Sequence, residues 1–362
     1  MDNYIVSARK YRPATFQSVV GQQHITDTLK NAIRTGQLAQ AFLFCGPRGV
    51  GKTTCARILA KTINCTHLTP EGEACGECES CRSFASANSM NIFELDAASN
   101  NSVEDIRELT SQVRIPPQTG KYKVYIIDEV HMLSQAAFNA FLKTLEEPPT
   151  WAKFILATTE RHKIIPTILS RCQVFDFKRI ETSDIVKHLA FVAQQEGVQY
   201  DEEALHLIAR KADGGLRDAL STFDQLVSFT GGSLTYKKCT ENLNILDYEY
   251  YFKFIDLFKA ADIAGALLLY EEIVAKGFEG QNFITGLSEH IRNLMVALDP
   301  STHKLLDTTD AVRTRYGEQA LNCGLPLLLK WLDISSDYEY RFRDAGNKRL
   351  FIEVGLMKMA AS

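Results

Sequence analysis

The sequence lacks long hydrophobic runs. None of its 362 residues lies in a stretch approaching the about 18 consecutive apolar residues that a membrane-spanning helix needs. The first ten residues contain no apolar core of the kind found in secretory signal peptides. We therefore expect a cytoplasmic protein without a membrane partner.

The sequence also lacks an excess of charge of either sign. It has 40 Lys and Arg against 44 Asp and Glu, which gives a net charge of −4. This balance excludes a protein that coats DNA through a broadly basic surface, so any contact with nucleic acid must use local clusters or backbone amides. The length and the 45% share of hydrophobic residues are typical of a soluble globular chain with two or three domains.

A glycine-rich loop, Gly46-Pro-Arg-Gly-Val-Gly-Lys-Thr53, follows the apolar run Ala41 to Cys45 and precedes a predicted helix. Its glycines let consecutive N–H groups point inward, toward the positive end of the helix dipole. This is a Walker A loop and not a chance glycine turn, because a strand precedes it and a helix follows. Lys52 would reach the β- and γ-phosphates, and Thr53 would ligate Mg²⁺. The candidate nucleotide contacts in this loop are Gly46, Gly49, Val50, Gly51, Lys52, Thr53 and Thr54.

A second apolar run, Lys123 to Ile127, ends in two acidic residues, Asp128 and Glu129. The run predicts a strand of a parallel sheet that is covered on both faces. Acidic pairs at strand ends are usually only solvated, but a Walker A loop upstream favours a Walker B pair. Asp128 would then hold Mg²⁺ through water, and Glu129 would polarise the attacking water. The sequence has no Asn-Lys-x-Asp motif for guanine, so we expect adenine as the base.

A third buried strand, predicted at Lys153 to Ala157, ends at Thr158-Thr159. A strand of this kind can lie between the two Walker strands and direct a hydroxyl toward the γ-phosphate. The basic segment from Ala8 to Gly21, which precedes the Walker A strand, allows two interpretations. It either packs as an edge segment or forms a wall of the base pocket.

Four of the nine cysteines cluster behind the Walker A helix, at Cys65, Cys75, Cys78 and Cys81. Thiols stay reduced in the cytosol, so their spacing points to metal before disulfides. Four sulfurs at these separations suit tetrahedral Zn²⁺, and a ligand set without an open position indicates a structural ion rather than a catalytic one. Free thiols are the alternative.

From Glu181 onward the pattern predicts helices only. Gly214-Gly215 separates two of them and places Arg217 in the first turn of the second, which hints at an anionic partner. The helices beyond Gly231-Gly232 carry leucine and aromatic stripes and predict a packing or oligomerisation domain. The ending at Ser362 has no evident stop signal, as expected for a truncated form.

Together these features resemble the bacterial DNA polymerase III gamma/tau family, the ATPases of sliding-clamp loaders. The resemblance covers nearly the whole chain. It is carried by Arg9-Lys-Tyr-Arg-Pro13, the Walker A loop, the four-cysteine insertion, Ile-Ile-Asp128-Glu-Val-His-Met-Leu133, Leu-Glu-Glu-Pro-Pro149, Ser170-Arg-Cys172 and Gly214-Gly-Leu-Arg217-Asp.

The resemblance implies an AAA+ fold in three parts. These are an α/β P-loop core with a parallel sheet at residues 1–179, a helical lid at 180–243, and an all-helical collar at 244–362. The core would carry the zinc-binding insertion at residues 65–81. By position, the residues that would border the adenine are Tyr11, Arg12, Val19 and Val20.

The resemblance also implies roles for three polar residues. Thr159 would be sensor 1, Arg217 would be sensor 2, and Arg171 would be an arginine finger that acts in trans on the ATP of a neighbouring subunit. The loop Ser99–Ser102 and the helix that starts at Ser134 match places where the family follows the DNA backbone.

The implied function is ATP-driven opening and loading of a ring clamp at primer–template DNA, with ATP, Mg²⁺ and Zn²⁺ as cofactors. The implied partners are delta and delta-prime subunits, further copies of this chain, the sliding clamp and primer–template DNA. The ATPase would work within the DNA polymerase III holoenzyme, a nucleotidyltransferase.

Two other functions are open to a chain with these motifs. A hexameric AAA+ motor on nucleic acid is expected to have an aromatic pore loop, which we do not find in the sequence. A nucleotide-gated scaffold without hydrolysis is expected to have degraded Walker residues, whereas the four Walker residues are intact.

Overall fold

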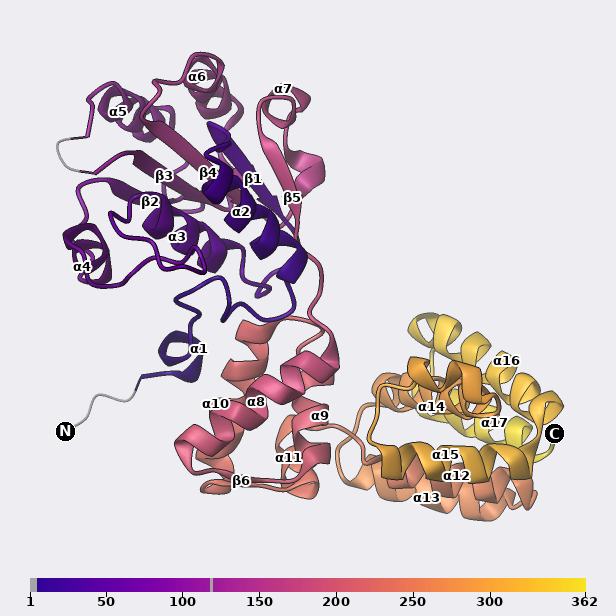
Figure 1. Ribbon diagram of the computed structural model, residues 1–362. Helices are drawn as coiled ribbons and strands as arrows, with labels where there is room; N and C mark the ends of the chain where they lie inside the picture. Colours follow the sequence, from indigo (N-terminus) through magenta and orange to yellow (C-terminus); the bar gives the residue numbers. More distant parts are fainter. Residues whose placement is uncertain (1–4, 118–119) are drawn as a thin grey trace. The chain divides into compact units, whose positions relative to one another are not determined.

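The computed structural model describes residues 5–117 and 120–362, so residues 1–4, which open the segment without a signal-peptide core, lie outside the described part. The chain divides into two compact units (Figure 1). The first comprises the described residues up to Val192 together with Lys211–Asp224. The second comprises Ala193–Arg210 and Gln225–Ser362. Helices α8 (Thr182–Glu196) and α10 (Leu216–Thr230) contribute to both units.

The first unit is an α/β domain. Its strands are β1 (Ala41–Cys45), β2 (Ile92–Asp96), β3 (Lys123–Asp128), β4 (Ala152–Thr158) and β5 (Gln173–Asp176). Its helices are α1 (Ser7–Lys10), α2 (Gln23–Thr35), α3 (Lys52–Ile63), α4 (Glu79–Ala85), α5 (Val103–Val113), α6 (Gln135–Glu146) and α7 (Pro166–Leu169). Short 3-10 turns follow β3 at Val130–Met132 and β4 at Arg161–Lys163.

All five strands run parallel, in the order β2-β3-β4-β1-β5. Strand β4 lies between β1 and β3, which confirms the prediction of a third strand between the two Walker strands. The register pairs Cys45 with Thr158 and Asp96 with Asp128. The ends of four strands therefore meet at one edge of the sheet, where ligands bind in folds of this kind.

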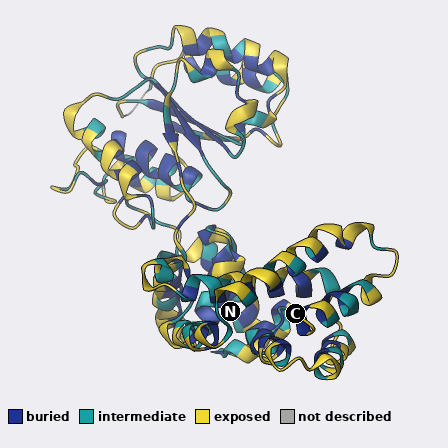
Figure 2. Cartoon of the chain, turned by 90° about the vertical axis from the view of Figure 1, so that its right-hand side faces the viewer, coloured by how far each residue is buried: buried dark blue, intermediate teal, exposed yellow. Residues whose placement is uncertain are grey.

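Both faces of the sheet are buried, as the apolar runs predict. Phe42 and Phe44 point into a core that also contains residues of α2 and α3. The alternate residues Leu43 and Cys45 point into a second core, with residues of α5 and α6. Figure 2 shows the strands dark blue between helices whose outer faces are yellow. This two-sided burial is typical of parallel sheets covered by crossover helices.

Ser102, with Asp105 three residues later, is a predicted N-cap, and helix α5 begins there. The Ser102 side chain accepts a hydrogen bond from the Asp105 N–H at 3.2 Å, and the Asp105 side chain accepts one from the Ser102 N–H at 3.1 Å. This capping box satisfies donors at the helix start that have no partner within the helix. Ser134 caps α6 in the same manner, through the N–H of Ala137.

The second unit is mostly helical. Apart from its share of α8 and α10, it contains α9 (Glu202–Lys211, whose last residue belongs to the first unit), α11 (Tyr236–Leu243), α12 (Tyr248–Lys259), α13 (Ile263–Ala275), α14 (Gly280–Ala297), α15 (Asp310–Cys323), α16 (Leu325–Arg341) and α17 (Lys348–Ala360). Short 3-10 turns lie at Pro300–Leu305 and Phe342–Asp344.

Two expectations for this part of the chain are wrong. The pattern is not purely helical, because β6 (Gln199–Tyr200) pairs in parallel with β7 (Ser233–Leu234). The sequence pattern also predicts one helical run from Tyr338 to the end of the chain, but the structure breaks this run between α16 and α17. The Asn347 side chain accepts a hydrogen bond from the Leu350 N–H at 3.0 Å and so starts a new helix.

An aromatic core holds the helices of the second unit together. Trp331 is fully buried, and its indole N–H donates to the carbonyl oxygen of Met359 at 2.8 Å, which joins α16 to α17. The Phe258 ring packs against this indole at 5.7 Å between centroids. Among the described residues, no helix has the length and apolar character needed to cross a membrane.

Because α17 packs closely on α16, we expect that a methyl group added at Gly355 will destabilise the fold. A Cβ at Gly355 would lie 2.8 Å from Cδ1 of the buried Tyr338 ring, whereas a Cβ at Gly317, in the middle of α15, would meet nothing within 4 Å. We expect Gly355→Ala to lower the free energy of unfolding by about 1–3 kcal/mol through overpacking. The control Gly317→Ala should raise it by roughly 0.5–1 kcal/mol, since alanine favours helix. Urea unfolding followed by circular dichroism measures both, and equal shifts would contradict this packing.

Candidate nucleotide-binding site

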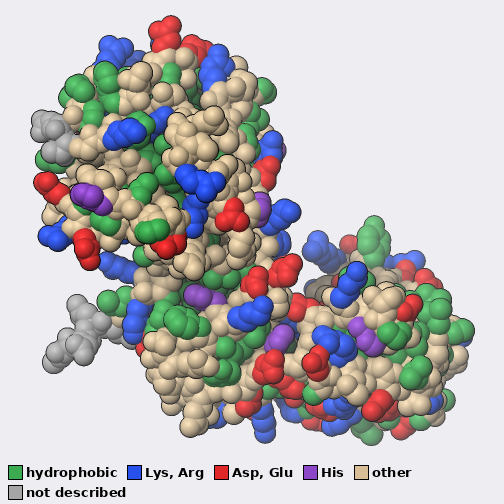
Figure 3. All heavy atoms as spheres, in the orientation of Figure 1, with side chains coloured by type: hydrophobic (Ala, Val, Ile, Leu, Met, Phe, Trp, Pro, Cys, Tyr) green, Lys and Arg blue, Asp and Glu red, His purple; other side chains and the backbone are tan. Residues whose placement is uncertain are grey.

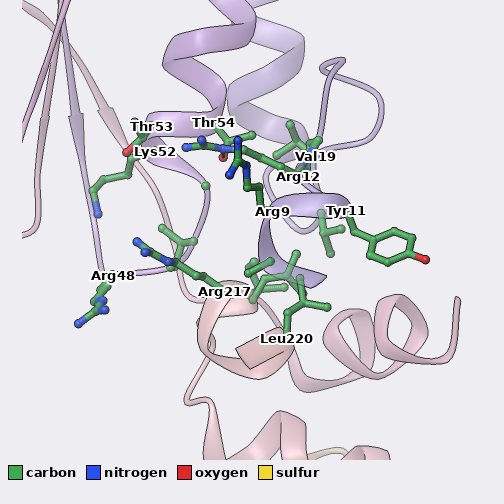
Figure 4. Close-up of a pocket in the computed structure, with 18 of the residues that line it drawn as sticks. Arg9, Tyr11, Arg12, Val19, Arg48, Lys52, Thr53, Thr54, Arg217 and Leu220 are labelled. Carbon is green, nitrogen blue, oxygen red and sulfur yellow. Dashed lines mark hydrogen bonds between the residues drawn. The ribbon is translucent and has the colours of Figure 1, made fainter. Parts of the chain in front are cut away.

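A cavity of about 690 Å³ opens at the carboxyl edge of the sheet in the first unit. Three segments form its walls, namely the loop between β1 and α3, the N-terminal segment that includes α1, and the first turns of α10 (Figure 4). The predicted site residues that line it are Tyr11, Arg12, Val19, Val20, Gly49, Val50, Gly51, Lys52, Thr53, Thr54, Asp128, Glu129 and Arg217. The volume lies within the range of small-molecule and cofactor sites.

The glycine-rich loop has the backbone that its sequence predicts. Gly46 has φ +148°, and a Cβ there would lie 2.4 Å from the carbonyl oxygen of Phe177, so no other residue fits. Although Gly46 does not line the cavity, its N–H donates to the Thr158 carbonyl oxygen at 3.2 Å and ties the loop to β4. Gly51 precedes α3 directly, so the N-terminus of that helix faces the cavity.

Lys52 is buried, with 5% of its surface exposed. Its ammonium donates to the carbonyl oxygens of Gly46 at 2.8 Å and Pro47 at 2.7 Å, inside the curve of the loop. Burial lowers the pKa of this ammonium, while the charges of Glu129 and Asp128 act in the opposite direction. A phosphate in the loop would compensate for the burial, because it adds negative charge beside the cation.

Two oxygen groups that could ligate a metal ion, the Thr53 hydroxyl and the Asp128 carboxylate, meet beside the loop. The Thr53 hydroxyl donates to Oδ2 of Asp128 at 2.5 Å, which joins the start of α3 to the end of β3. The other carboxylate oxygen, Oδ1, accepts from the Glu129 N–H at 3.0 Å. A hydroxyl next to a carboxylate is a donor pair that suits a hard cation such as Mg²⁺.

Glu129 has a strained backbone. Its φ of +48° lies in the left-handed region, which costs a residue with a Cβ roughly 1–2 kcal/mol. Its Oε2 atom accepts a hydrogen bond from the Thr159 hydroxyl at 3.1 Å. Thr159 does not line the cavity, but this contact places it beside a carboxylate that does.

His131 is a neighbour of this carboxylate that sequence reasoning missed. Its Nδ1 lies 3.0 Å from the Thr158 hydroxyl and 3.5 Å from Oε2 of Glu129, and its Nε2 lies 3.2 Å from Glu160. The sequence feature that could have identified His131 is its position three residues after Asp128, which a single 3-10 turn brings back to the carboxylates.

The basic segment before the loop forms a wall of the cavity, which decides between its two interpretations. Arg12 donates from Nε to the Thr54 hydroxyl at 3.2 Å, and its pKa is lowered by burial and then by the charge of Arg57. The Tyr11 ring meets Phe191 edge-on at 6.2 Å, and Figure 4 shows it turned away from Arg12 and Thr54.

The third wall of the cavity comes from α10. Arg217 is the second residue of this helix, as predicted, and its N–H donates to the Gly49 carbonyl oxygen at 3.3 Å. Leu216 and Leu220 add an apolar surface that the sequence analysis did not assign to the site. The sequence analysis also missed Arg9, Arg48 and Asp96, which line the cavity. Asp96 could have been identified from the sequence, because it is an acidic residue at the end of a predicted strand.

Arg171 is not among the residues that line the cavity in the described part of the chain. Its guanidinium donates to Oε1 of Glu146 and to the Thr167 carbonyl oxygen, both at 2.8 Å. About a third of the side chain is exposed. The two segments predicted to follow DNA lie side by side, because the Ser134 N–H donates to the Asn101 carbonyl oxygen at 3.3 Å.

The four clustered cysteines converge on one point. Their sulfur atoms all lie within 4.8 Å of one another, with 3.6 Å between those of Cys65 and Cys75 and 4.0 Å between those of Cys65 and Cys78. Hydrogen bonds from the N–H groups of Cys78 and Glu77 lower the pKa of the Cys75 thiol. Burial raises the pKa of the Cys81 thiol to about 12, so a cation is needed to keep all four as thiolates.

Two known protein families match this chain, one over most of the α/β domain and one over the helices that follow it. The family described as "DNA polymerase III, delta subunit" matches residues 21–181. The family described as "DNA polymerase III clamp loader subunit, ATPase lid domain" matches residues 184–232. A solved structure of the Thermotoga maritima RuvB Holliday junction branch migration motor is similar with a TM-score of 0.49 and 20% identity, over 68% of this chain and 78% of that one.

Curated relatives match over greater lengths. DNA polymerase III subunit tau of Bacillus subtilis is 39% identical over 358 residues, which cover 99% of this chain but 63% of that protein. DNA polymerase III subunit gamma of Buchnera aphidicola is 38% identical over 306 residues, which cover 84% of this chain and 82% of that protein. The chain spans only 36% to 63% of the length of several relatives. With its Walker residues gathered at the edge of a parallel five-stranded sheet, the chain belongs to the DNA polymerase III gamma/tau family of AAA+ clamp-loader subunits.

Proposed function

We propose that this chain is the ATPase subunit of a replicative clamp loader, in which ATP binding and hydrolysis open a sliding clamp and load it at primer–template DNA. The observation that carries the proposal is the convergence of Lys52, Thr53, Asp128 and Glu129 in one cavity, with Arg217 opposite them. The proposed assembly contains delta and delta-prime subunits and further copies of this chain. Nucleotidyl transfer would belong to the polymerase of the holoenzyme, since the proposed site activates water.

In the proposed reaction each residue has a distinct role. Lys52 and the N–H groups of the loop bind the β- and γ-phosphates, which the burial of Lys52 favours. Glu129 orients and polarises the water that attacks the γ-phosphate, and the Thr159 hydroxyl, 3.1 Å from it, holds that carboxylate in place as sensor 1. Arg217 neutralises phosphate charge from the lid side as sensor 2.

Thr53 and Asp128 are the proposed magnesium ligands, because their oxygens are already within 2.5 Å of each other. When bound, Mg²⁺ would neutralise charge on the phosphates. The adenine would lie against Tyr11, Arg12, Val19 and Val20, all of which line the cavity. The proposed parts are a core at residues 1–179, a lid at 180–243 and a collar at 244–362.

We also assign the cysteine cluster to one structural zinc ion. A tetrahedral centre with Zn–S bonds of about 2.3 Å separates its sulfurs by about 3.8 Å. The separations of 3.6 Å and 4.0 Å in the cluster fit that geometry. Four thiolates leave no position for substrate, so the ion would close the loop between Cys65 and Cys75 rather than act in catalysis.

The charge of the visible surface agrees with a chain that contacts DNA locally. Figure 3 shows Lys and Arg side chains interspersed with Asp and Glu on the face that it presents. Backbone amides and polar side chains would therefore make many of the proposed contacts with phosphate, from the loop Ser99–Ser102 and the start of α6.

The division of labour between Lys52 and Glu129 is testable. We expect Lys52→Ala to abolish ATP binding, because it removes the phosphate cation. Glu129→Gln should retain binding but lose hydrolysis by about 10²–10⁴-fold, because it removes the general base. Nucleotide titration and phosphate release, with the exposed Glu108→Gln on α5 as an unaffected control, measure both. Equal loss of binding in the two variants would refute the assignment.

The zinc assignment predicts one metal ion per chain by elemental analysis. Replacing Cys75 and Cys78 with Ser should remove the metal, because each supplies a ligand sulfur. Cys239→Ala, at a buried cysteine of α11 outside the cluster, should leave the metal content unchanged. Wild-type protein that contains no metal after gentle purification would overturn the assignment.

The proposal that Arg171 acts in trans predicts a dependence on assembly. Arg171→Ala should bind ATP normally, because the residue does not line its own cavity. The assembled complex should lose clamp- and DNA-stimulated hydrolysis by about 10³–10⁵-fold. The exposed Arg34→Ala on α2 is the matched control.

Mixing subunits separates action in trans from action in cis. In a mixed complex, an intact Arg171 from a Lys52→Ala subunit would face the intact cavity of an Arg171→Ala subunit and restore part of the activity. Unimpaired stimulated hydrolysis in a complex made only of Arg171→Ala subunits would exclude the finger role.

A further inference from the structure

Glu73 connects the cysteine cluster to the segment that walls the nucleotide cavity. It lies on the loop between Cys65 and Cys75, yet its side chain is only 7% exposed. Oε2 accepts a hydrogen bond from the Phe16 N–H at 2.9 Å, and Oε1 accepts one from the Gln17 N–H at 3.1 Å. A buried carboxylate held by two consecutive amides is a strong and directional contact.

A cation completes the surroundings of this carboxylate. The Lys30 ammonium, on α2, lies 3.3 Å from Oε1 of Glu73. Removal of Glu73 would therefore leave two N–H groups and a partly buried ammonium without this acceptor. Such a loss is costly in a buried position, about 1–3 kcal/mol for each group left unsatisfied.

Hydrogen bonds within the loop that carries Glu73 hold its shape. The Thr69 N–H donates to the Glu73 carbonyl oxygen at 2.9 Å, and the Glu73 N–H donates to the Thr69 hydroxyl at 3.2 Å. Leu68 and Ala74 form an antiparallel bridge just inside the two cysteines that bound the loop. A metal ion between Cys65 and Cys75 would fix both ends of this short loop and thereby the position of Glu73.

On the other side, Phe16 and Gln17 begin the turn that enters the cavity. Phe16 is 1% exposed and packs in the same core cluster as Val19 and Val50, both of which line the cavity. The Val19 N–H donates to the Phe16 carbonyl oxygen at 3.2 Å. A shift of Phe16 would therefore displace Val19 and the proposed adenine wall. The phosphate loop has supports of its own, from the Lys52 ammonium to the Gly46 and Pro47 carbonyl oxygens and from the Gly46 N–H to β4.

From this chain of contacts we propose that Glu73 is a positioning residue that links metal occupancy of the cysteine cluster to the adenine side of the nucleotide pocket. The inference rests on the proposed function for the identity of the ligand. It gives the four-cysteine insertion a role in nucleotide affinity in addition to its own stability.

The experiment compares two ligands that share phosphates and differ in the base. Calorimetric titration of the full chain with ATP and with inorganic tripolyphosphate gives the two dissociation constants. We expect Glu73→Ala to weaken ATP binding about tenfold and to leave tripolyphosphate binding unchanged, because the phosphate loop keeps its own supports. Glu73→Gln, which keeps one acceptor oxygen, should show a smaller loss. The exposed Glu71→Ala, two residues earlier on the same loop, should show none.

Metal removal tests the link itself. A zinc chelator should weaken ATP binding to the wild-type chain about as much as Glu73→Ala does, and it should cause little further loss in Glu73→Ala, because both changes act through one contact. Elemental analysis of each variant confirms that the metal is retained before chelation, and retained tripolyphosphate binding shows that the fold is intact.

Three results would overturn the inference. These are unchanged ATP affinity in Glu73→Ala, equal losses for ATP and tripolyphosphate, and fully additive losses from chelation and substitution. A failure of the proposed function is a different result, since the wild-type chain would then bind neither ATP nor tripolyphosphate.

Discussion

Parallel pairing of β1 with β4 and β5 is the constraint on which the rest of the first unit depends. A parallel sheet is buried on both faces, so helices must cover both, and the strand ends must meet at one edge. The loop after β1, the carboxylates after β3 and the hydroxyl after β4 therefore meet without a special arrangement of their own. In the sheet order, β4 lies between β1 and β3, so the hydroxyl at its end lies between the phosphate loop and the carboxylates.

Contacts within the chain fix the charged groups at this edge of the sheet. Burial lowers the pKa of both Lys52 and Arg12, so the cavity holds cations at a desolvation cost that an anionic ligand would offset. The carboxylates of Asp128 and Glu129 accept hydrogen bonds from the hydroxyls of Thr53 and Thr159. Groups fixed in this way need little reorganisation during reaction, which is the main requirement of phosphoryl transfer.

Arg171 and the cysteine cluster extend the site beyond the cavity. Arg171 is a third exposed and paired with Glu146, and its proposed role in trans would make hydrolysis depend on assembly. The cluster reaches in the opposite direction, through a buried carboxylate to the turn at Phe16. Both proposals give a residue outside the cavity an effect on nucleotide binding or hydrolysis.

The sequence by itself determined the elements whose signals are local. The glycines of the loop, the two-residue cysteine spacing and the Ser102 capping box each specify backbone geometry within a few residues, and the structure contains all three. The burial of β1 on both faces also follows from an apolar run alone.

Contacts between residues distant in sequence were decided only by the tertiary structure. Glu73 meets Phe16 and Gln17 across more than 50 positions, and no local pattern marks that pairing. The sequence left two interpretations of the N-terminal segment open, and only the structure shows that it walls the cavity. The pairing of β6 with β7 and the break before α17 were not predicted. The physical reason is that short apolar and polar runs are compatible with several partners, and only the packing of the whole domain selects one.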